Sequence, residues 1–365
     1  MATLYPAGIE LPPGWSFALA SGDEGVAELL QNIILFVPLG LTLALGGTTR
    51  ALRLIAAGAL LSFAVEFAQQ WIPGRDPSLA DLLCNTAGTA VGVLLVRTAP
   101  RWLTPPPPSS RAAWLSLGTA LAAAAVWLAT GLLLRPMLPA PDAIQSWTPD
   151  LGSHMDLYEG RVLSVTGRIG VAEPLRIVTV AGPTPGRLAP LLDVDDGPGP
   201  AGTLVSVDRT DLVLRNRSRS MFLKLARPDL RAPGALSGVA PGDTFTVTAW
   251  TDRHGYCLTR DAKRWCGLGY TMGDGWKLIF DPVHFPPWAR RVLNTLWIAG
   301  WCLGIGWWAR RHWATGVAIA VVTFTLLAGP GLVGLLATPI AEIAGGVAGI
   351  AGAWLVARRY RSMPA

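Results

Sequence analysis

Residues 29–49 read LLQNIILFVPLGLTLALGGTT and carry no charged side chain. About 20 mainly apolar residues are enough for a helix to cross the hydrocarbon core of a bilayer. Comparable stretches recur along the 365-residue chain, which is 51% hydrophobic but only 15% charged, whereas soluble domains have about 25% charged residues. The composition therefore predicts an integral membrane protein and argues against an ordinary soluble enzyme.

The apolar stretches predict an α-helical membrane bundle of about seven spanning helices, four before and three after a polar middle region. In chain order we expect an N-terminal tail at 1–27, a four-helix membrane domain at 28–135 (helices near 29–49, 52–72, 79–97 and 112–134), a β domain at 136–289, three membrane helices at 290–358 (near 291–309, 313–336 and 339–357) and a tail at 359–365.

The positions of the arginines predict the orientation. The net charge is +6, but most arginines lie at the ends of apolar stretches, which is typical of membrane anchors, so we expect no nucleic-acid partner. Cytoplasmic loops are enriched in Lys and Arg. The arginine clusters at 50–53, 97–111, 310–311 and 358–361 all fall on one side of a seven-helix topology. The N-terminus and residues 136–289 are then extracytoplasmic, and the C-terminus is cytoplasmic.

Between residues 140 and 285, short alternating apolar runs replace the long blocks. The predicted strands are 161–171, 175–181, 203–207, 212–215, 221–225, 244–249, 256–259, 264–268 and 276–280. Many short strands separated by Gly, Pro and Asp predict an antiparallel β-sandwich or jelly roll.

Two features of this region bear on disulfide and metal chemistry. Cys257 and Cys266 flank a turn, which favours a disulfide in an oxidising compartment over two free thiols. Asp193, Asp195 and Asp196 resemble the start of a calcium loop, but no distant glutamate completes the set, so an acidic surface turn is favoured. The four histidines lack ligand spacing. We therefore expect no metal and no cofactor.

Four tryptophans of the same region allow two interpretations. They form either an aromatic platform for sugars or part of a sandwich core, and the core is the default for residues of this size. They are Trp147, Trp250, Trp265 and Trp276.

The first three helices carry polar and small residues at mostly helical spacing, which places most of each set on one helix face. The sets are Asn32, Pro38 and Gly40; Ser62, Glu66 and Gln69; and Asp81, Asn85, Gly88 and Gly92. The four-residue spacing between the last two glycines also permits close helix approach.

A carboxylate inside a membrane helix costs several kcal/mol unless it is paired or wetted. Glu66 lies near the outer end of its helix, Arg75 follows in the loop, and Asp81 opens the next helix. A hairpin can bring these three together at the outer leaflet. One interpretation, which we favour, is polar contact between helices. The other is a pocket in which Arg75 binds a lipid phosphate or a carboxylate.

These residues also carry a family resemblance. The spacing Asn32…Pro38-x-Gly40, Ser62-x-x-x-Glu66-x-x-Gln69, Pro73-Gly74-Arg75 and Asp81-x-x-x-Asn85-x-x-Gly88 resembles the VanZ-like family of small bacterial membrane proteins, over about residues 25–97. The resemblance implies an envelope membrane bundle. The name-giving member is associated with teicoplanin resistance, and the family's biochemical activity is unsettled.

The chain departs from that family at its start. Family members usually begin with a further hydrophobic segment, and Tyr5-Pro6-Ala7-Gly8 looks like the loop that would follow it, so we expect the true start upstream of Met1. The middle region is similar to laminin-G or concanavalin-like sandwiches through Cys257…Cys266-Gly267-Leu268-Gly269 and Gly275-Trp276-Lys277-Leu278. This second resemblance implies binding of glycan or protein rather than hydrolysis.

The leading hypothesis is a non-catalytic envelope protein in contact with membrane lipids. Residues 140–285 would bind glycan or cell-wall material, and the polar pocket would bind a lipid head group. One alternative is a membrane enzyme acting on a lipid-linked glycan or glycolipid, with Glu66 or Asp81 as general base, although the sequence shows no nucleophile–base pair. The other alternative is a transporter, although no inverted repeat is visible.

Overall fold

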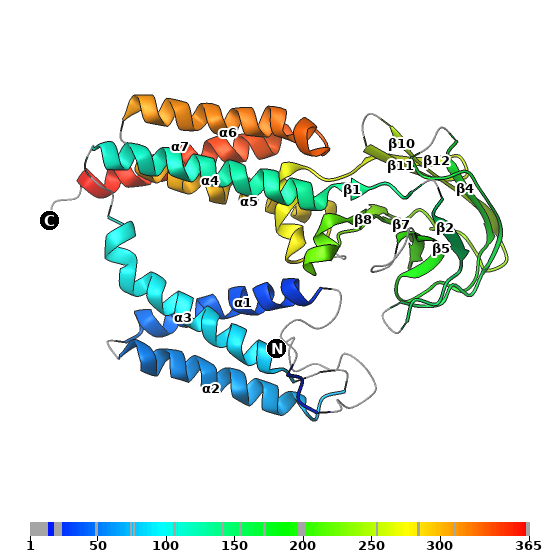
Figure 1. The fold of residues 1–365 in the computed structure, drawn as a ribbon, viewed down its shortest axis with the longest axis horizontal. Coiled ribbons are helices and arrows are strands. Elements are labelled where there is room, and N and C mark those ends of the chain that lie inside the picture. The colour runs from blue at the N-terminus through cyan, green and yellow to red at the C-terminus, as the bar shows by residue number, and fades with distance from the viewer. Residues whose placement is uncertain are drawn as a thin grey trace. The chain divides into compact units, whose positions relative to one another are not determined.

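The computed structural model divides into two compact units. The first unit is Met1–Pro107 with Leu223–Ala226, and the second is Pro108–Phe222 with Arg227–Ala365 (Figure 1). The structure describes residues 14–17, 24–47, 50–73, 75, 77–104, 107, 109–140, 142–152, 155–170, 173–195, 202–252, 255–282, 285–309 and 311–362.

The described helices of the first unit are α1 (Gly25–Leu45), α2 (Ala51–Gln69) and α3 (Leu79–Trp102). Glycines bring α1 and α3 close together. A Cβ atom on Gly88 would overlap the carbonyl oxygen of Ile33, and a Cβ atom on Gly40 would overlap that of Thr89. Small residues at a helix contact allow backbones to approach in this way. Gly92 lies at the same contact.

The start of α1 is capped by a segment that is distant in sequence. The backbone N–H groups of Val26 and Ala27 donate to the carbonyl oxygen of Lys224, at 3.0 and 3.1 Å. The first N–H groups of a helix lack partners inside the helix, so this contact satisfies two of them. It also accounts for the assignment of Leu223–Ala226 to the first unit.

The described helices of the second unit are α4 (Ser110–Leu134), α5 (Pro287–Trp308), α6 (His312–Val333) and α7 (Ile340–Ser362). They share a core in which Trp127 of α4, Ile298 and Cys302 of α5 and Leu326 of α6 are at most 1% exposed. α4 packs against α5 and α6, and α5 also packs against α7. Of the four helices expected at 28–135, α4 thus packs with helices of the second unit, and its small-residue face is buried in this core.

The β region follows α4 and precedes α5. In its described part, one antiparallel sheet has the order β12-β11-β10-β4-β3, a second has the order β2-β5-β6-β7-β9, and β1 pairs with β8. The strands are β1 (Pro136–Met137), β2 (Ile144–Trp147), β3 (Arg161–Thr166), β4 (Leu175–Val180), β5 (Ala189–Asp195), β6 (Thr203–Asp208), β7 (Asp211–Arg215), β8 (Arg217–Ser218), β9 (Leu230–Ala232), β10 (Thr244–Asp252), β11 (Gly255–Arg260) and β12 (Lys263–Leu268). The predicted antiparallel β region is confirmed, and the narrower jelly-roll assignment stays a prediction.

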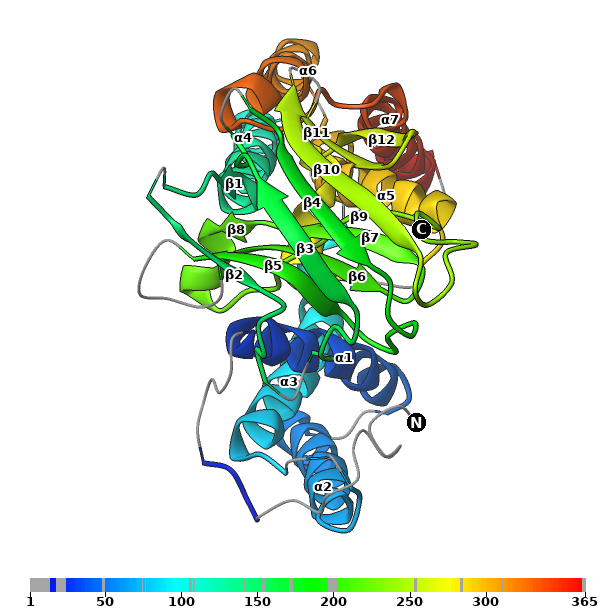
Figure 2. The same cartoon turned by 90° about the vertical axis from the view of Figure 1, so that its right-hand side faces the viewer.

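The two five-stranded sheets differ in burial. Along β4, the buried residues Leu175, Ile177 and Thr179 alternate with more exposed ones, so one face of that sheet is turned toward solvent. β5 and β6 are buried almost throughout, which means that their sheet is covered on both faces. In Figure 2 the strands of the first sheet cross in front of those of the second.

Two predicted strands are 3-10 helices instead. Residues 221–225 overlap η2 (Arg219–Leu223), and residues 276–280 overlap η3 (Met272–Leu278). η3 begins with a capping box in which the Asp274 carboxylate accepts the backbone N–H of Thr271 at 2.7 Å, and this local bonding outweighs the alternating pattern. β5 lies outside the predicted strands because its buried run does not alternate.

Within the described residues, six helices are long and apolar enough to span a membrane: α1, α2, α3, α4, α6 and α7. α5 is not among them, so this measure supports six of the seven expected spans. The physical reason lies in the composition of α5, whose 22 residues include five tryptophans and Asn294. Indole and amide groups are less hydrophobic than the aliphatic side chains of the other helices.

Candidate functional site

The turn between α2 and α3 holds a buried carboxylate. Glu66, on the last turns of α2, is only 2% exposed. Its carboxylate accepts the backbone N–H of Ser78 at 2.9 Å. The Ser78 hydroxyl in turn accepts the N–H of Ala80 at 3.1 Å and caps α3. One side chain of α2 therefore holds the start of the next helix.

Two further hydrogen bonds join the three helices. Asn32 of α1 donates its amide to the carboxylate of Asp81 at the start of α3, at 2.7 Å. Asn85 of α3 donates to the hydroxyl of Ser62 on α2, at 3.0 Å. Ser62 and Asn85 are both buried. Hydrogen bonds of this kind stabilise contacts between membrane helices by about 1 kcal/mol.

The remaining predicted residues of this group lie close by along the chain. Gln69 is buried one turn after Glu66 on α2. Arg75 is half-buried in the turn, where its backbone N–H donates to the carbonyl oxygen of Ile72 at 3.2 Å. Pro38 is exposed on α1. The structure thus brings Glu66 and Asp81 to the two ends of the turn that carries Arg75.

A line of aromatic rings runs along the outside of α2 to the same turn. Trp15 stacks on Phe63 with ring centroids 6.0 Å apart, Phe63 stacks on Phe67 at 6.1 Å, and Phe67 meets Trp71 edge-on at 4.9 Å. Trp71 is 62% exposed. Tryptophan is enriched where a membrane meets water, so this end of α2 has the composition of an interfacial region.

A short N-terminal segment completes the cluster. The backbone N–H of Ser16 donates to the carbonyl oxygen of Pro77 at 2.8 Å, and the N–H of Leu79 donates to the carbonyl oxygen of Ser16 at 3.0 Å. These bonds make a parallel bridge between Ser16 and Ser78. Ser78 therefore donates to Glu66, while its neighbours Pro77 and Leu79 bond to the chain before α1.

Most polar groups of this cluster form hydrogen bonds in contacts between helices. Among the described buried atoms, Asn85 Oδ1 has no hydrogen-bond partner. A carboxylate can accept several hydrogen bonds, and the described bonds to Glu66 come from one backbone N–H. The cluster can therefore hold the hairpin and still accept a donor from a polar head group.

The architecture and this polar cluster define a multi-pass membrane protein with a β region in its chain. Residues 7–100 match the family model described as VanZ/LLP1, so this part of the chain is VanZ-like, and the resemblance drawn from the sequence is confirmed. No curated protein and no solved structure matches the chain.

Sequence analysis did not identify a second buried polar cluster, which joins η3 to α5 and α7. The Glu342 carboxylate of α7 accepts the Thr271 hydroxyl at 2.7 Å, the Gly273 N–H at 3.0 Å and the Asn294 amide of α5 at 3.3 Å. Asn294 also donates to Asp274 at 3.0 Å. In the sequence, Glu342 is visible as an acidic residue in an apolar stretch. Its partners lie 48 to 71 residues away, so no local pattern identifies them.

A third cluster lies in the β region and gathers arginines around one acid. Asp229 receives two hydrogen bonds from Arg215, at 2.6 and 3.1 Å, and one from Arg231 at 3.2 Å. Although burial opposes its ionisation, Arg215 and Arg231 lower the pKa of Asp229. Arg231 also pairs with Asp208 at 2.6 Å. Burial lowers the pKa of the neighbouring Arg227 to about 10.

Two of the three carboxylates of the weak calcium candidate lie within the described residues. Asp193 is buried at the end of β5, whereas Asp195 is exposed, and Asp196 lies outside the described residues. Burial raises the pKa of Asp193, Asp195 raises it further, and Arg227 opposes both. A guanidinium thus already supplies positive charge near Asp193.

The two predicted cysteines form a disulfide between β11 and β12, Cys257–Cys266. The four tryptophans do not share one surface. Trp250 pairs with Cys257 and Trp265 with Leu258, so these two point to opposite faces of one sheet. Trp147 belongs to the other sheet, and Trp276 donates to Asn294 at 2.8 Å.

Proposed function

We propose that this protein is a multi-pass envelope membrane protein that binds the phosphate of a lipid head group at the α2–α3 turn. The observation that carries the proposal is the α2–α3 turn, which carries Arg75 and connects the helix of Glu66 to the helix that Asp81 opens. Arginine is well suited to phosphate because its guanidinium offers paired N–H donors. The aromatic rings ending at Trp71 support placing this turn at the membrane interface.

We place the turn and the β region on the extracytoplasmic side. The Cys257–Cys266 disulfide supports this placement, because such bonds persist in oxidising compartments. In the second unit, η3 packs against the Asn294 end of α5 and the Glu342 end of α7, whereas Arg311 and Arg358 lie at the opposite helix ends. The arginine-rich ends are then cytoplasmic.

The β region is proposed to recognise glycan or other surface material. A cavity of about 260 Å³ opens between its strands and loops, with Tyr158, Arg209 and Phe245 in its lining. Aromatic faces with a nearby guanidinium can hold a sugar ring. A glycan array probed with the full-length protein tests this point: retention of a glycan that Arg209→Ala abolishes supports it, and retention of none contradicts it.

The head-group proposal is tested by lipid binding to the purified full-length protein. A polyprenyl phosphate, with phosphatidylcholine as competitor, is added to delipidated protein, and bound lipid is counted by native mass spectrometry. We expect Arg75→Gln to lower polyprenyl phosphate binding about tenfold, which is the loss of one charge-assisted hydrogen-bonded pair.

Arg50→Gln is the matched control. Arg50 is exposed just before α2, so its substitution removes the same charge at the opposite end of that helix. If Arg50→Gln and Arg75→Gln lose the same amount of polyprenyl phosphate binding, the lipid is attracted only by the overall positive charge of the protein. Unchanged binding in Arg75→Gln would leave the α2–α3 cluster with a structural role only.

A further inference from the structure

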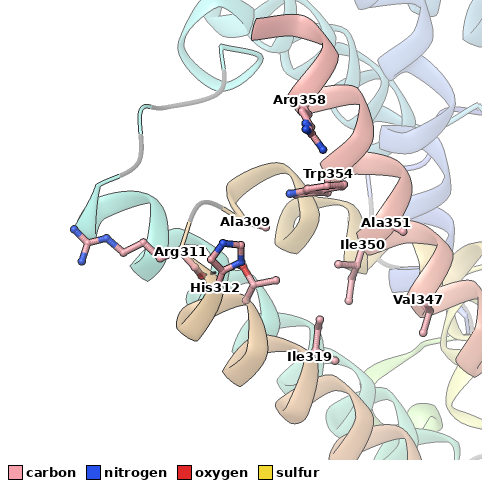
Figure 3. Close-up of a pocket in the computed structure, with 10 residues that line it drawn as sticks. Ala309, Arg311, His312, Ile319, Val347, Ile350, Ala351, Trp354 and Arg358 are labelled. Carbon is pink, nitrogen blue, oxygen red and sulfur yellow. Dashed lines mark hydrogen bonds between the residues drawn. The ribbon is translucent and has the colours of Figure 1, made fainter. Parts of the chain in front are cut away.

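The second unit contains a larger cavity at the helix ends remote from the β region. Its volume is about 520 Å³, and it lies where α5 ends, α6 begins and α7 approaches its C-terminal end. Figure 3 shows Ile319, Ile350 and Ala351 along its length and Arg358, Trp354 and His312 nearer the helix ends. The site lies in the second unit and includes none of the residues of the α2–α3 cluster.

The cavity has mainly apolar walls and opens between α6 and α7. α6 and α7 each pack mainly against another helix, so they leave a groove between them. Ile319 is 41% and Val347 is 60% exposed, whereas Ile350 is largely buried and forms the floor. On membrane helices, exposed side chains of this kind face hydrocarbon. The groove therefore suits an acyl chain lying along the helices.

The titratable residues among those lining the cavity are all basic. Arg311 and His312 begin α6, and Arg358 extends from α7 with its guanidinium 5.5 Å from the centre of the Trp354 ring. In Figure 3, His312 and Arg358 border the opening, while the guanidinium of Arg311 points away from it. Stacking on Trp354 holds Arg358 at the end of the apolar groove.

The geometry points to a binding site for an anionic phospholipid. The phosphate lies beside Arg358 and His312, and one acyl chain follows Ile319, Ala351 and Val347. The basic residues at the opening favour an anionic head group, because arginine binds phosphate oxygens strongly. The apolar groove favours a lipid over a free phosphate. Under the proposed topology this lipid belongs to the cytoplasmic leaflet, where anionic lipids attract basic residues.

The test measures lipid retention by the delipidated full-length protein. An equimolar mixture of phosphatidylglycerol and phosphatidylcholine is added, and the bound lipids are counted by native mass spectrometry. Wild type is compared with Arg358→Gln, with Ala351→Trp, which fills the groove and leaves every charge in place, and with the control Arg111→Gln. Arg111 is exposed at the start of α4 and does not line the cavity.

We expect wild type and Arg111→Gln to prefer phosphatidylglycerol equally. Arg358→Gln should reduce that preference about fivefold, the value for one arginine near a membrane surface. Ala351→Trp should remove the bound lipid of either kind. Equal retention of the two lipids by wild type, an unchanged preference in Arg358→Gln, or the same loss in Arg111→Gln would each overturn the proposal. If Ala351→Trp does not fold, the comparison of the two arginine variants decides.

Discussion

At the scale of single residues, Asp229 is a buried acid of the β region with two arginine partners. Its side chain is 1% exposed and meets both Arg215 and Arg231. A buried ion pair contributes little compared with apolar packing, but the removal of one partner leaves an uncompensated charge. Because the pKa of Asp229 is lower in the folded protein than in the unfolded chain, its contribution to the free energy of unfolding depends on pH.

We predict that Asp229→Asn destabilises the protein strongly at neutral pH and less in acid. A lowered folded-state pKa stabilises the fold above the unfolded pKa, and this stabilisation is lost as the pH falls through the folded-state value. At pH 7 the free energy of unfolding should fall by about 3–5 kcal/mol. Tryptophan fluorescence during unfolding in detergent, at pH 7 and at about pH 3, measures the difference.

Asp142→Asn serves as the control for this prediction, because Asp142 is exposed. It should change stability by less than about 0.5 kcal/mol at either pH. If Asp229→Asn lowers the free energy of unfolding as much in acid as at pH 7, the packing of the Asp229 side chain, and not its ionisation, explains its role.

At the scale of helices, the first unit is held by close backbone approach and a few polar bonds. The contact between α1 and α3 is close because three of its residues are glycines, which have no side chain to separate the helices: Gly40, Gly88 and Gly92. The Asn32–Asp81 hydrogen bond then joins α1 to α3, and the Ser62–Asn85 bond joins α2 to α3. In lipid, where apolar burial does not drive helix association, packing and hydrogen bonding carry the energy.

We predict that Gly88→Leu separates α1 from α3 and lowers stability by about 2 kcal/mol or more, because the added side chain meets the backbone at Ile33. Thermal unfolding in detergent is the measurement. Gly118→Leu in α4 is the matched control, since nothing lies within 4 Å of a Cβ atom there. Equal melting temperatures for the two variants would rule out the tight α1–α3 contact.

At the scale of the whole molecule, the open question is which segments cross the bilayer. α5 falls outside the six helices that qualify by length and composition. It nevertheless packs against α4 and α7 along their length, and its residues Ile298, Cys302 and Ile305 are fully buried. Where a helix packs against spanning helices, it can carry residues less hydrophobic than those that face lipid. We therefore propose that α5 crosses with its neighbours.

Cysteine labelling of intact cells tests this topology. In a background with Cys84→Ala and Cys302→Ala, which leaves the disulfide intact, single cysteines replace Asp142 in the β region and His312 at the start of α6. We predict that a membrane-impermeant maleimide labels Asp142→Cys directly and His312→Cys only after permeabilisation. Labelling of both from outside would mean that α5 does not cross, and direct labelling of His312→Cys alone would reverse the orientation.

The sequence by itself determined the class of the protein, because long apolar stretches and their arginine-rich ends are local properties of the chain. It also determined the VanZ-like region, whose polar residues repeat at helical spacing. Only the tertiary structure decided that α4 packs with α5 and α6, and that Glu342 meets Thr271 and Asn294. Those contacts join residues that are far apart in the chain, and no local pattern of hydrophobicity records which distant faces meet.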